Sequence, residues 1–393
     1  MSVLAETAGR LGARTKARAH GYRVEFFQDW KQVVARWNDV APSTPFQHPV
    51  WCEAWYDAFA GTVEPLIVEV SDAATGEPAL LLPLIRRRQN GIAVVEFADC
   101  DLTDYNAPLL GPAAPRDEQA AGALWRDLVA ALRKLSGGAD LMRFRKMPAD
   151  LAGQPNPLAL LDEAGPCSLN GNVVTTGEDY DAWRYTLEKT VRKELERSWR
   201  VFSRDAAAQF GLFTDKDEAL RILSTTEAQQ GARMESLGLN FILNNETCAA
   251  FYRNLVRGGL GDGYAIVSAL TVGEEVVATL LGIRHGAHYT MIRISNAGEK
   301  WSNCSPGRLV IERTMAALHQ DGVREFDFSI GNYAYKRRFG VERRALVDLS
   351  AALSPRGLPY ALRDRAAREL RRYPRLAALL KRALGKPPSR EEG

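Results

Sequence analysis

The chain has 393 residues, of which 46% are hydrophobic and 25% are charged, and its net charge at pH 7 is +3. This length allows two domains of ordinary size, and the small net charge argues against a dedicated DNA-binding protein. No apolar run approaches the roughly 20 residues of a membrane span. Since the opening residues also lack the apolar core of a secretory signal, we expect a cytoplasmic protein.

Neither the cysteines nor the histidines form a recognisable site in the sequence. The five cysteines lie far apart and include no C-x-x-C pair, so we expect reduced thiols. The five histidines show no metal-ligand spacing, and we expect no metal. The NTPase phosphate loop, the dinucleotide fingerprint and the nucleophile elbow of hydrolases are also missing, which leaves those three classes without support.

The first part of the chain alternates strands and helices after residues 1–20, which we expect to be flexible. Hydrophobic periods of two and 3.6 residues distinguish the two element types. The loop after residue 97 holds Asp104 and Tyr105, which either form a turn or contact a cationic or hydroxylated substrate. The predicted strands are 22–27, 64–70, 79–86, 92–97 and 140–145, and the predicted helices are 29–40, 50–60 and 117–135.

A stretch rich in Pro and Gly follows, and the same pattern then repeats. Both parts run as strand, helices, three-strand meander, helix and strand, from which we infer an internal duplication of the fold. The predicted elements of the second part are strands at 173–176, 208–214, 264–272, 275–284, 288–295, 323–330 and 345–353, and helices at 179–204, 215–236, 247–258 and from 306. The predicted organisation is an N-terminal domain at 21–146, a linker at 147–170, a C-terminal domain at 171–355 and a basic tail at 356–393.

The most informative stretch begins with the turn at Ser305. Pro306 suits a first helical turn, where its missing N–H would be unpaired in any case. Gly307 leaves the first amides open to an anion, and Arg308 adds positive charge beside the helix dipole. The turn therefore predicts a phosphate-binding site. The matching turn of the first copy, at 109–112, lacks the arginine, so we infer one such site.

Beyond this helix, the alternation in 323–330 places Asp327 on the face opposite Phe326 and Phe328. A basic aromatic loop then follows at 331–339.

Two other basic features have alternative interpretations. Five cations spaced by three or four residues on helix 179–204 form either a solvated face with ion pairs or an anion-binding face. The basic and apolar tail at 361–386 is either an exposed or partner-bound helix, or a segment that makes peripheral contact with an anionic membrane.

These features together resemble the GCN5-related N-acetyltransferase (GNAT) superfamily. Two patterns are similar to its BioF2-like branch of cellulose-biosynthesis-associated acetyltransferases: S-P-G-[RK]-L at 305–309 and D-F-x-x-G-x-x-x-Y-K-x-x-F-G at 327–340. Further matches are P-F-Q-H-P at 45–49 with Trp51, the Asp104-Tyr105 pair and the basic helix. The resemblance implies an α/β (α+β) fold of tandem duplicated GNAT-like domains, each a mixed, mostly antiparallel sheet flanked by helices.

The resemblance also implies the donor, acetyl-CoA or another acyl-CoA, and the residues that hold it. Pyrophosphate binding is expected at Ser305, Gly307, Arg308 and Leu309. The acyl carbonyl is expected to contact a backbone amide of the fourth strand, within Ile292, Arg293 and Ile294.

Catalytic residues are expected after the donor-binding helix. Asp327 is the candidate base or acceptor-orienting carboxylate, and Tyr335 the candidate acid that reprotonates the thiolate, with Tyr333 as its rival. Lys336 would offset phosphate or thiolate charge. The candidate acceptor-binding residues are Asp104, Tyr105, Asn332 and Tyr333.

We therefore expect an acyltransferase that acts on an amine or hydroxyl, such as that of a sugar or polysaccharide precursor. One alternative is a Fem-type peptidyltransferase that uses aminoacyl-tRNA, since those proteins share a similar Y-K-x-x-F-G ending. Another is a degenerate transferase that serves as a partner subunit in polysaccharide assembly.

Overall fold

The computed structural model describes residues 21–371 and Tyr373, except 38, 39, 41, 42, 240, 242 and 244. The expected flexible start at 1–20 and most of the basic tail lie outside this range. Within it, no helix is both long enough and apolar enough to cross a membrane.

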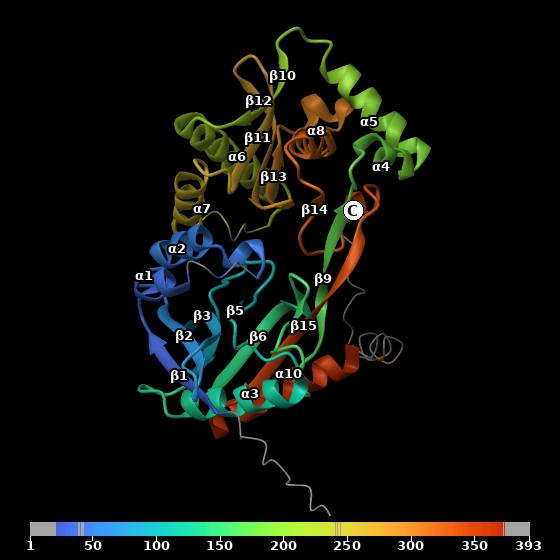
Figure 1. The fold of residues 1–393 in the computed structure, drawn as a ribbon. Helices are drawn as coiled ribbons and strands as arrows, with labels where there is room; N and C mark the ends of the chain where they lie inside the picture. Colours follow the sequence, from blue (N-terminus) through green and yellow to red (C-terminus); the bar gives the residue numbers. More distant parts are fainter. Residues whose placement is uncertain are drawn as a thin grey trace, which may run out of the picture.

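A single sheet of 13 strands runs through the molecule (Figure 1). In the first half, β1 (Tyr22–Phe27), β2 (Glu64–Asp72), β3 (Pro78–Gln89) and β4 (Ile92–Phe97) pair antiparallel. The next strand, β6 (Leu141–Pro148), is parallel to β4. The last strand, β15 (Glu342–Ala352), is antiparallel to β6. The short β5 (Leu109–Leu110) pairs with β3.

The second half repeats this order. The strands β10 (Ala208–Phe213), β11 (Ala265–Val272), β12 (Glu275–His285) and β13 (His288–Asn296) pair antiparallel. Then β14 (Glu325–Asp327) is parallel to β13, and β9 (Gly165–Thr175) is antiparallel to β14. The predicted mixed, mostly antiparallel sheet with duplicated halves is confirmed.

In each half, the strand at the inner edge of the sheet is out of sequence order with its neighbours. The first half is completed by β15, the final strand, and the second half by β9, which precedes all its other strands. These two strands pair antiparallel and join the halves into one sheet. The predicted linker at 147–170 therefore contains the end of β6, the hairpin of β7 (Asp150–Leu151) and β8 (Gln154–Pro155), and the start of β9. The domain boundaries stay a prediction.

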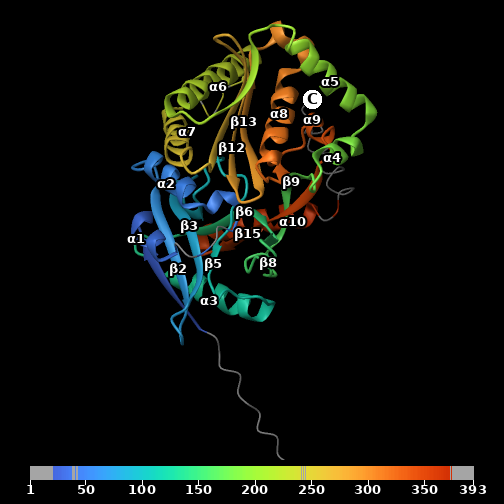
Figure 2. The same cartoon turned by 45° about the horizontal axis from the view of Figure 1, so that its top comes forward.

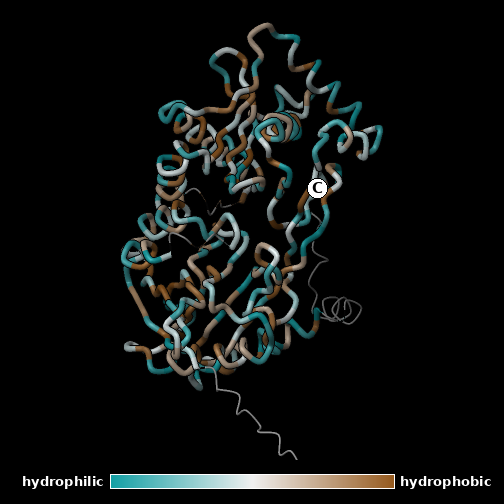
Figure 3. The backbone as a smooth tube through the Cα atoms, in the orientation of Figure 1, coloured by the Kyte–Doolittle hydropathy of each residue, from teal (hydrophilic) through white to brown (hydrophobic). Residues whose placement is uncertain are grey.

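Helices cover both faces of the second half (Figure 2). One face carries α6 (Lys216–Ser236) and α7 (Glu246–Gly259), and the other carries α5 (Lys189–Phe202) and α8 (Pro306–Gln320). In the first half, α3 (Glu118–Arg133) and α10 (Leu358–Arg371) flank the sheet. Hydrophobic stretches follow the strands between these layers (Figure 3).

An aromatic cluster fastens the first half to the second. The helix α2 (Pro49–Ala58), preceded by α1 (Trp30–Val34), packs on α7, where Trp51 meets Phe251 edge to face at 4.9 Å. The aromatic side chains on this helix are therefore part of the core, and their helical spacing places them on one face.

The helix predicted at 29–40 is shorter, since α1 ends at Val34, and the strand predicted at 173–176 is the end of the longer β9. Two other predicted elements differ further from the structure. The helix expected at 179–204 is broken into α4 (Tyr180–Thr186) and α5, because Leu187 adopts extended backbone and turns into the core. The strand expected at 323–330 ends at Asp327, because Ser329 has φ of 62° and leaves the ladder. This early end shapes the site described next.

Candidate active site

The amino end of α8 is open to an anion. Ser305 takes the cap position with left-handed backbone, but none of the described side chains caps the helix. The amides of Arg308 and Leu309 already donate to the Ser305 carbonyl, and the Ser305 amide donates to Ser302. Of the four residues expected to hold pyrophosphate, Gly307 alone keeps an amide without a partner in the described chain. A Cβ at Gly307 would meet only Asn296 and Ile294, at 3.7 and 3.9 Å.

The Arg308 guanidinium at this end is shared with a carboxylate. Its Nη2 donates to Ser305 Oγ at 2.8 Å and pairs with Glu194 of α5 at 2.5 Å. Arg338 pairs with the other oxygen of Glu194. These hydrogen bonds, led by that from Arg308, lower the pKa of Glu194. An incoming phosphate would therefore compete with one carboxylate for two arginines.

The corresponding end of α3 in the first half is closed. Its cap is Asp117, whose carboxylate accepts from the Ala120 amide at 2.8 Å. A fixed negative charge thus lies where an anion would bind. The sequence comparison with 109–112 was wrong about the position, since that segment is β5 and the turn after it. The inference of one phosphate site agrees with the contrast between the two helix ends.

A bulge interrupts the fourth strand of the second half. Gly282 pairs with Met291 and Leu281 pairs with Arg293, so Ile292 has no opposite residue on β12. Such a bulge re-aims the backbone locally. A Cβ at Gly282 would lie 2.5 Å from the Thr290 carbonyl oxygen, so the strands can approach here only at glycine.

The side chain of Arg293 points to the α6 and α7 layer. It donates from Nε to Gln230 at 2.9 Å and lies over the Tyr252 ring at 4.4 Å. Ile294 offers its carbonyl to the amide of Gln230 at 2.9 Å. Any contact of Arg293 with a donor on the α8 side must therefore come from its backbone.

The strands β13 and β14 separate beside this bulge. They pair only at three positions, from His288 with Glu325 to Thr290 with Asp327, while β13 continues to Asn296. The separation begins where the loop carrying Ser329 leaves the sheet. Gly307 at the amino end of α8 lies near Ile294 and Asn296, beside the part of β13 that follows the bulge.

Asp327 is buried between the two halves. Its Oδ1 accepts from Tyr105 Oη at 2.9 Å and from the Ser329 amide at 2.7 Å, and its residue is 1% exposed. Burial raises the pKa of Asp327. A loop of the first half thus closes over a carboxylate of the second, 222 residues away.

The predicted acceptor residue Asp104 lies beside this pair and is less enclosed. Burial raises the pKa of Asp104 to about 6, against the lowering effects of the Ser329 side chain and the charge of Lys146. Ser329 Oγ in turn donates to the Met291 carbonyl at 2.7 Å, next to the bulge. The structure therefore brings Asp104, Tyr105 and Asp327 together near Ile292.

Lys336 holds the loop that follows Asp327. It is 3% exposed and donates to the carbonyls of Ile330 at 2.6 Å and Ser329 at 3.3 Å. Burial lowers the pKa of Lys336 to about 8, although the carboxylates of Asp104 and Asp327 oppose this. The run 327–340 is thus one locked loop, completed by Phe328 against Phe339 at 5.1 Å.

The remaining predicted residues lie at the rim. Tyr333 and Tyr335 stack with ring centroids 6.1 Å apart, and Asn332 and Tyr333 are exposed. Burial raises the pKa of Tyr335 to about 12. Tyr335 is therefore protonated at neutral pH, as a proton donor must be.

Residues that the sequence did not indicate complete the site. His288 binds Glu325 at 3.0 Å and Thr290 at 3.1 Å, and its Nε2 is 3.8 Å from Asp327. Asn172 of β9 donates to the carbonyls of Ser329 and Gly331 at 2.7 and 2.9 Å. Their partners are distant in sequence, so no local motif could have revealed them. No group of three metal-ligating side chains gathers within the described residues.

Comparisons with known proteins agree with this geometry. Residues 189–337 match a family model described as an acetyltransferase (GNAT) domain. No curated protein sequence matches the chain.

Three solved structures share the fold at low identity, which is evidence for the fold alone. FemX has a TM-score of 0.52 and 10% identity, covering 75% of this chain and 90% of its own. The C-terminal domain (DUF2156) of a putative lysylphosphatidylglycerol synthetase from Agrobacterium fabrum has a TM-score of 0.50 and 13% identity, with 85% and 95% coverage. A conserved protein of unknown function from Bacteroides thetaiotaomicron has a TM-score of 0.51 and 10% identity, with 84% and 100% coverage.

The family match covers the bulged strand, the open helix end and the loop with Asp327 and Lys336. Residues 189–337 of this chain are therefore similar to a GNAT acetyltransferase domain.

Proposed function

We propose that this protein transfers an acyl group from acyl-CoA to an amine or hydroxyl of a small acceptor. One observation carries the proposal: inside the matched segment, the free Gly307 amide at the uncapped end of α8 lies along the opening beside the β13 bulge. A helix end of this kind binds phosphate, and a bulged strand presents a backbone donor. The closed end of α3 supports a single donor site.

We assign the general base to Asp104. A carboxylate with a pKa of about 6 is mostly ionised at neutral pH and still basic enough to take a proton. It would accept the proton of the acceptor as that nitrogen or oxygen attacks the acyl carbonyl and the C–S bond breaks. The leaving thiolate then takes a proton from Tyr335 or from water.

With Asp104 as the base, the two predicted catalytic residues Asp327 and Lys336 become positioning residues. The Asp327 carboxylate is enclosed and already bonded to Tyr105 and Ser329, so we assign it the positioning of those two residues. Lys336 is likewise bonded to two backbone carbonyls. Both act on the acceptor only through the loops they hold.

Thermal unfolding with acetyl-CoA, longer acyl-CoA and free CoA tests the donor. A ligand at about 100 times its dissociation constant adds roughly 2.7 kcal/mol of stability. We expect this shift in the wild type and in Gly307→Ala, whose Cβ meets only ordinary contacts. Gly307→Trp, which fills the turn, should lose the shift while it melts normally without ligand. An equal shift in the Trp variant would show that donors bind elsewhere.

Transfer from aminoacyl-tRNA is the second candidate, favoured by the surface of α5. Lys189, Lys193, Arg197 and Arg200 on this helix and Arg204 just beyond it are all exposed, as a phosphate-binding stripe requires. The fold that this chain shares with FemX is consistent with the Fem-type alternative. Charged tRNA should then bind with a steep salt dependence that Arg200→Glu weakens. Binding that is absent at low salt would remove this candidate.

A further inference from the structure

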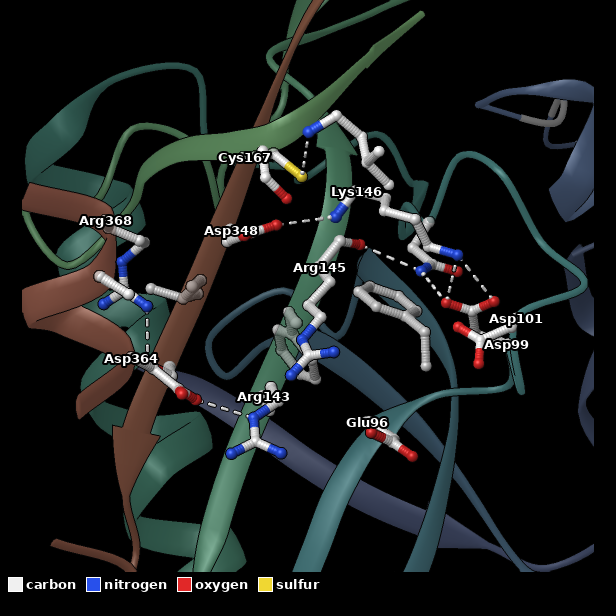
Figure 4. Close-up of a pocket in the computed structure, with 18 of the residues that line it drawn as sticks. Glu96, Asp99, Asp101, Arg143, Arg145, Lys146, Cys167, Asp348, Asp364 and Arg368 are labelled. Carbon is white, nitrogen blue, oxygen red and sulfur yellow. Dashed lines mark hydrogen bonds and ion pairs between the residues drawn. The ribbon is translucent and has the colours of Figure 1, made fainter. Parts of the chain in front are cut away.

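Charged side chains line a cavity in the first half (Figure 4), and none of the residues proposed to hold the donor line it. Its volume is about 370 Å³, which is the size of small-molecule sites. The strands β4 and β6 pair at only two positions and then separate, and the cavity lies where they do so. The helix α10 closes one side of it. This is the first-half counterpart of the opening between β13 and β14.

Buried arginines line this cavity, and their charges are only partly satisfied. Arg368 of α10 is 4% exposed, and its Nη1 donates to Ser350 at 2.7 Å. Arg143 of β6 is 7% exposed and pairs with Asp364 at 2.8 Å, but its Nη2 has no partner among the described residues. Burying a guanidinium without full pairing is costly, which indicates that a ligand completes the set.

A third arginine faces the cavity without a hydrogen bond or ion pair in the described chain. This is Arg145, two residues beyond Arg143 on the same face of β6 (Figure 4). Three other lining cations do have acidic partners: Arg87 with Glu96, Lys146 with Asp99, and Arg371 with Asp348. Six cations and five carboxylates line the cavity in total, and Asp101 is the one lining carboxylate outside these pairs and that of Arg143 with Asp364. The excess charge is positive.

The backbone is also adapted to these arginines. A Cβ at Gly165 would lie 3.3 Å from Cδ of Arg368, so the absence of a side chain there gives the arginine its place. Carboxylates and the side chains of Ser168, Ser350 and Asn106 supply acceptors and donors around the arginines. Such a lining suits a compound that carries both hydroxyls and an anionic group.

The cavity adjoins the proposed reaction site. Ile330 lines it and also accepts the hydrogen bond of Lys336 at 2.6 Å. Lys146 lines it as well, and its charge acts on Asp104. A molecule held in the cavity could therefore extend past Ile330 toward Asp104.

We propose that this cavity binds the anionic end of the acceptor, a hydroxylated phosphate or carboxylate such as a sugar phosphate or a sugar acid. That the ligand is the acceptor rests on the proposed acyl transfer. The binding of an anion in this cavity does not depend on that proposal. Guanidinium groups pair with either anion through two parallel hydrogen bonds.

Calorimetric titration of the full chain at constant ionic strength tests this. The probes are glucose 6-phosphate, glucuronate, neutral glucose and inorganic phosphate. We expect one of the two sugar anions to bind at least tenfold more tightly than glucose, and the stronger one identifies the anion. Arg145→Gln, which breaks no pairing, should weaken that probe about tenfold, as loss of one charged hydrogen bond predicts. Arg221→Gln, at an exposed position of α6 that does not line the cavity, should leave the binding unchanged.

Three results would overturn the proposal: equal affinity for glucose and the anions, unchanged binding in Arg145→Gln, or no binding of any probe. Arg368→Met, checked for a normal melt, gives a second variant and should also weaken the anion. Acetyl-CoA stabilisation, measured on the same samples, keeps the two proposals apart. It should persist in Arg145→Gln, and its absence from the wild type would count against the donor site alone.

Discussion

Gly171→Ala should break the link between the two halves at Tyr105. A Cβ at Gly171 would lie 2.5 Å from Tyr105 Oη and 3.1 Å from Cζ. Tyr105 must then move, although it packs on Phe46 with centroids 5.6 Å apart, and its 2.9 Å bond to Asp327 is lost. Overpacking costs about 1–3 kcal/mol, and a hydrogen bond to a charged group is worth about 1.5–3 kcal/mol. We expect a total loss of about 3–5 kcal/mol in the free energy of unfolding.

Tyr105→Phe provides the decisive background for this test. It loses the hydrogen bond but also removes the atom at 2.5 Å, leaving ring carbons at 3.1 and 3.2 Å. Adding Gly171→Ala to this variant should therefore cost only about 1 kcal/mol more, so the two changes should couple by about 2–4 kcal/mol.

Urea unfolding followed by tryptophan fluorescence measures all four proteins of this cycle. Gly122→Ala on α3, where a Cβ meets nothing closer than 3.8 Å, is the control and should be neutral or stabilising. Gly171→Ala that costs the same with and without Tyr105→Phe would refute the assigned contact.

Three further predictions concern charged groups. Because the folded pKa of Asp104 is about 6, above its ordinary 3.8, this residue opposes folding increasingly from pH 4 to 6; Asp104→Asn should gain stability relative to wild type over that range in thermal melts, and parallel profiles would contradict the raised pKa. The hydrogen bond from His288 and the Arg344 charge lower the pKa of Glu325 to about 2, so its stabilisation should fade as pH falls from 4.5 toward 2. His288→Ala should flatten the pH dependence of the urea-unfolding free energy over that range, whereas an unchanged slope would exclude the pair. Glu194→Gln frees Arg308 and Arg338 and should tighten CoA binding about fivefold by calorimetry; weaker binding would show that Glu194 instead holds Arg308 in place for the donor.

Much of the fold could be predicted from local patterns. The meanders of both halves alternate cleanly, and Pro306 and Gly322 mark the start and end of α8. The positions of β9 and β15, which pair with each other and join the two halves, could not be predicted. Strand pairing depends on partners that are far apart in the sequence. The break at Leu187 follows from tertiary packing, which overrides helix propensity.

The site was predictable as residues but not as an arrangement. The run 327–340 was identified, and Lys336 was expected to offset phosphate or thiolate charge, whereas its ammonium is buried and donates to the carbonyls of Ser329 and Ile330. Asp327 was expected to face an acceptor, and only the approach of Tyr105 shows that it is enclosed. The burial of Lys336 and the enclosure of Asp327 depend on long-range contacts, which the spacing of residues in the sequence does not reveal.

A crystal structure with bound CoA tests the central claim most directly. We predict the pyrophosphate within hydrogen-bonding distance of the Gly307 amide, Arg308 turned from Glu194 toward it, and the thiol end beside Ile292. A pyrophosphate at any other site, or crystals that bind no CoA while the protein binds charged tRNA, would contradict the account.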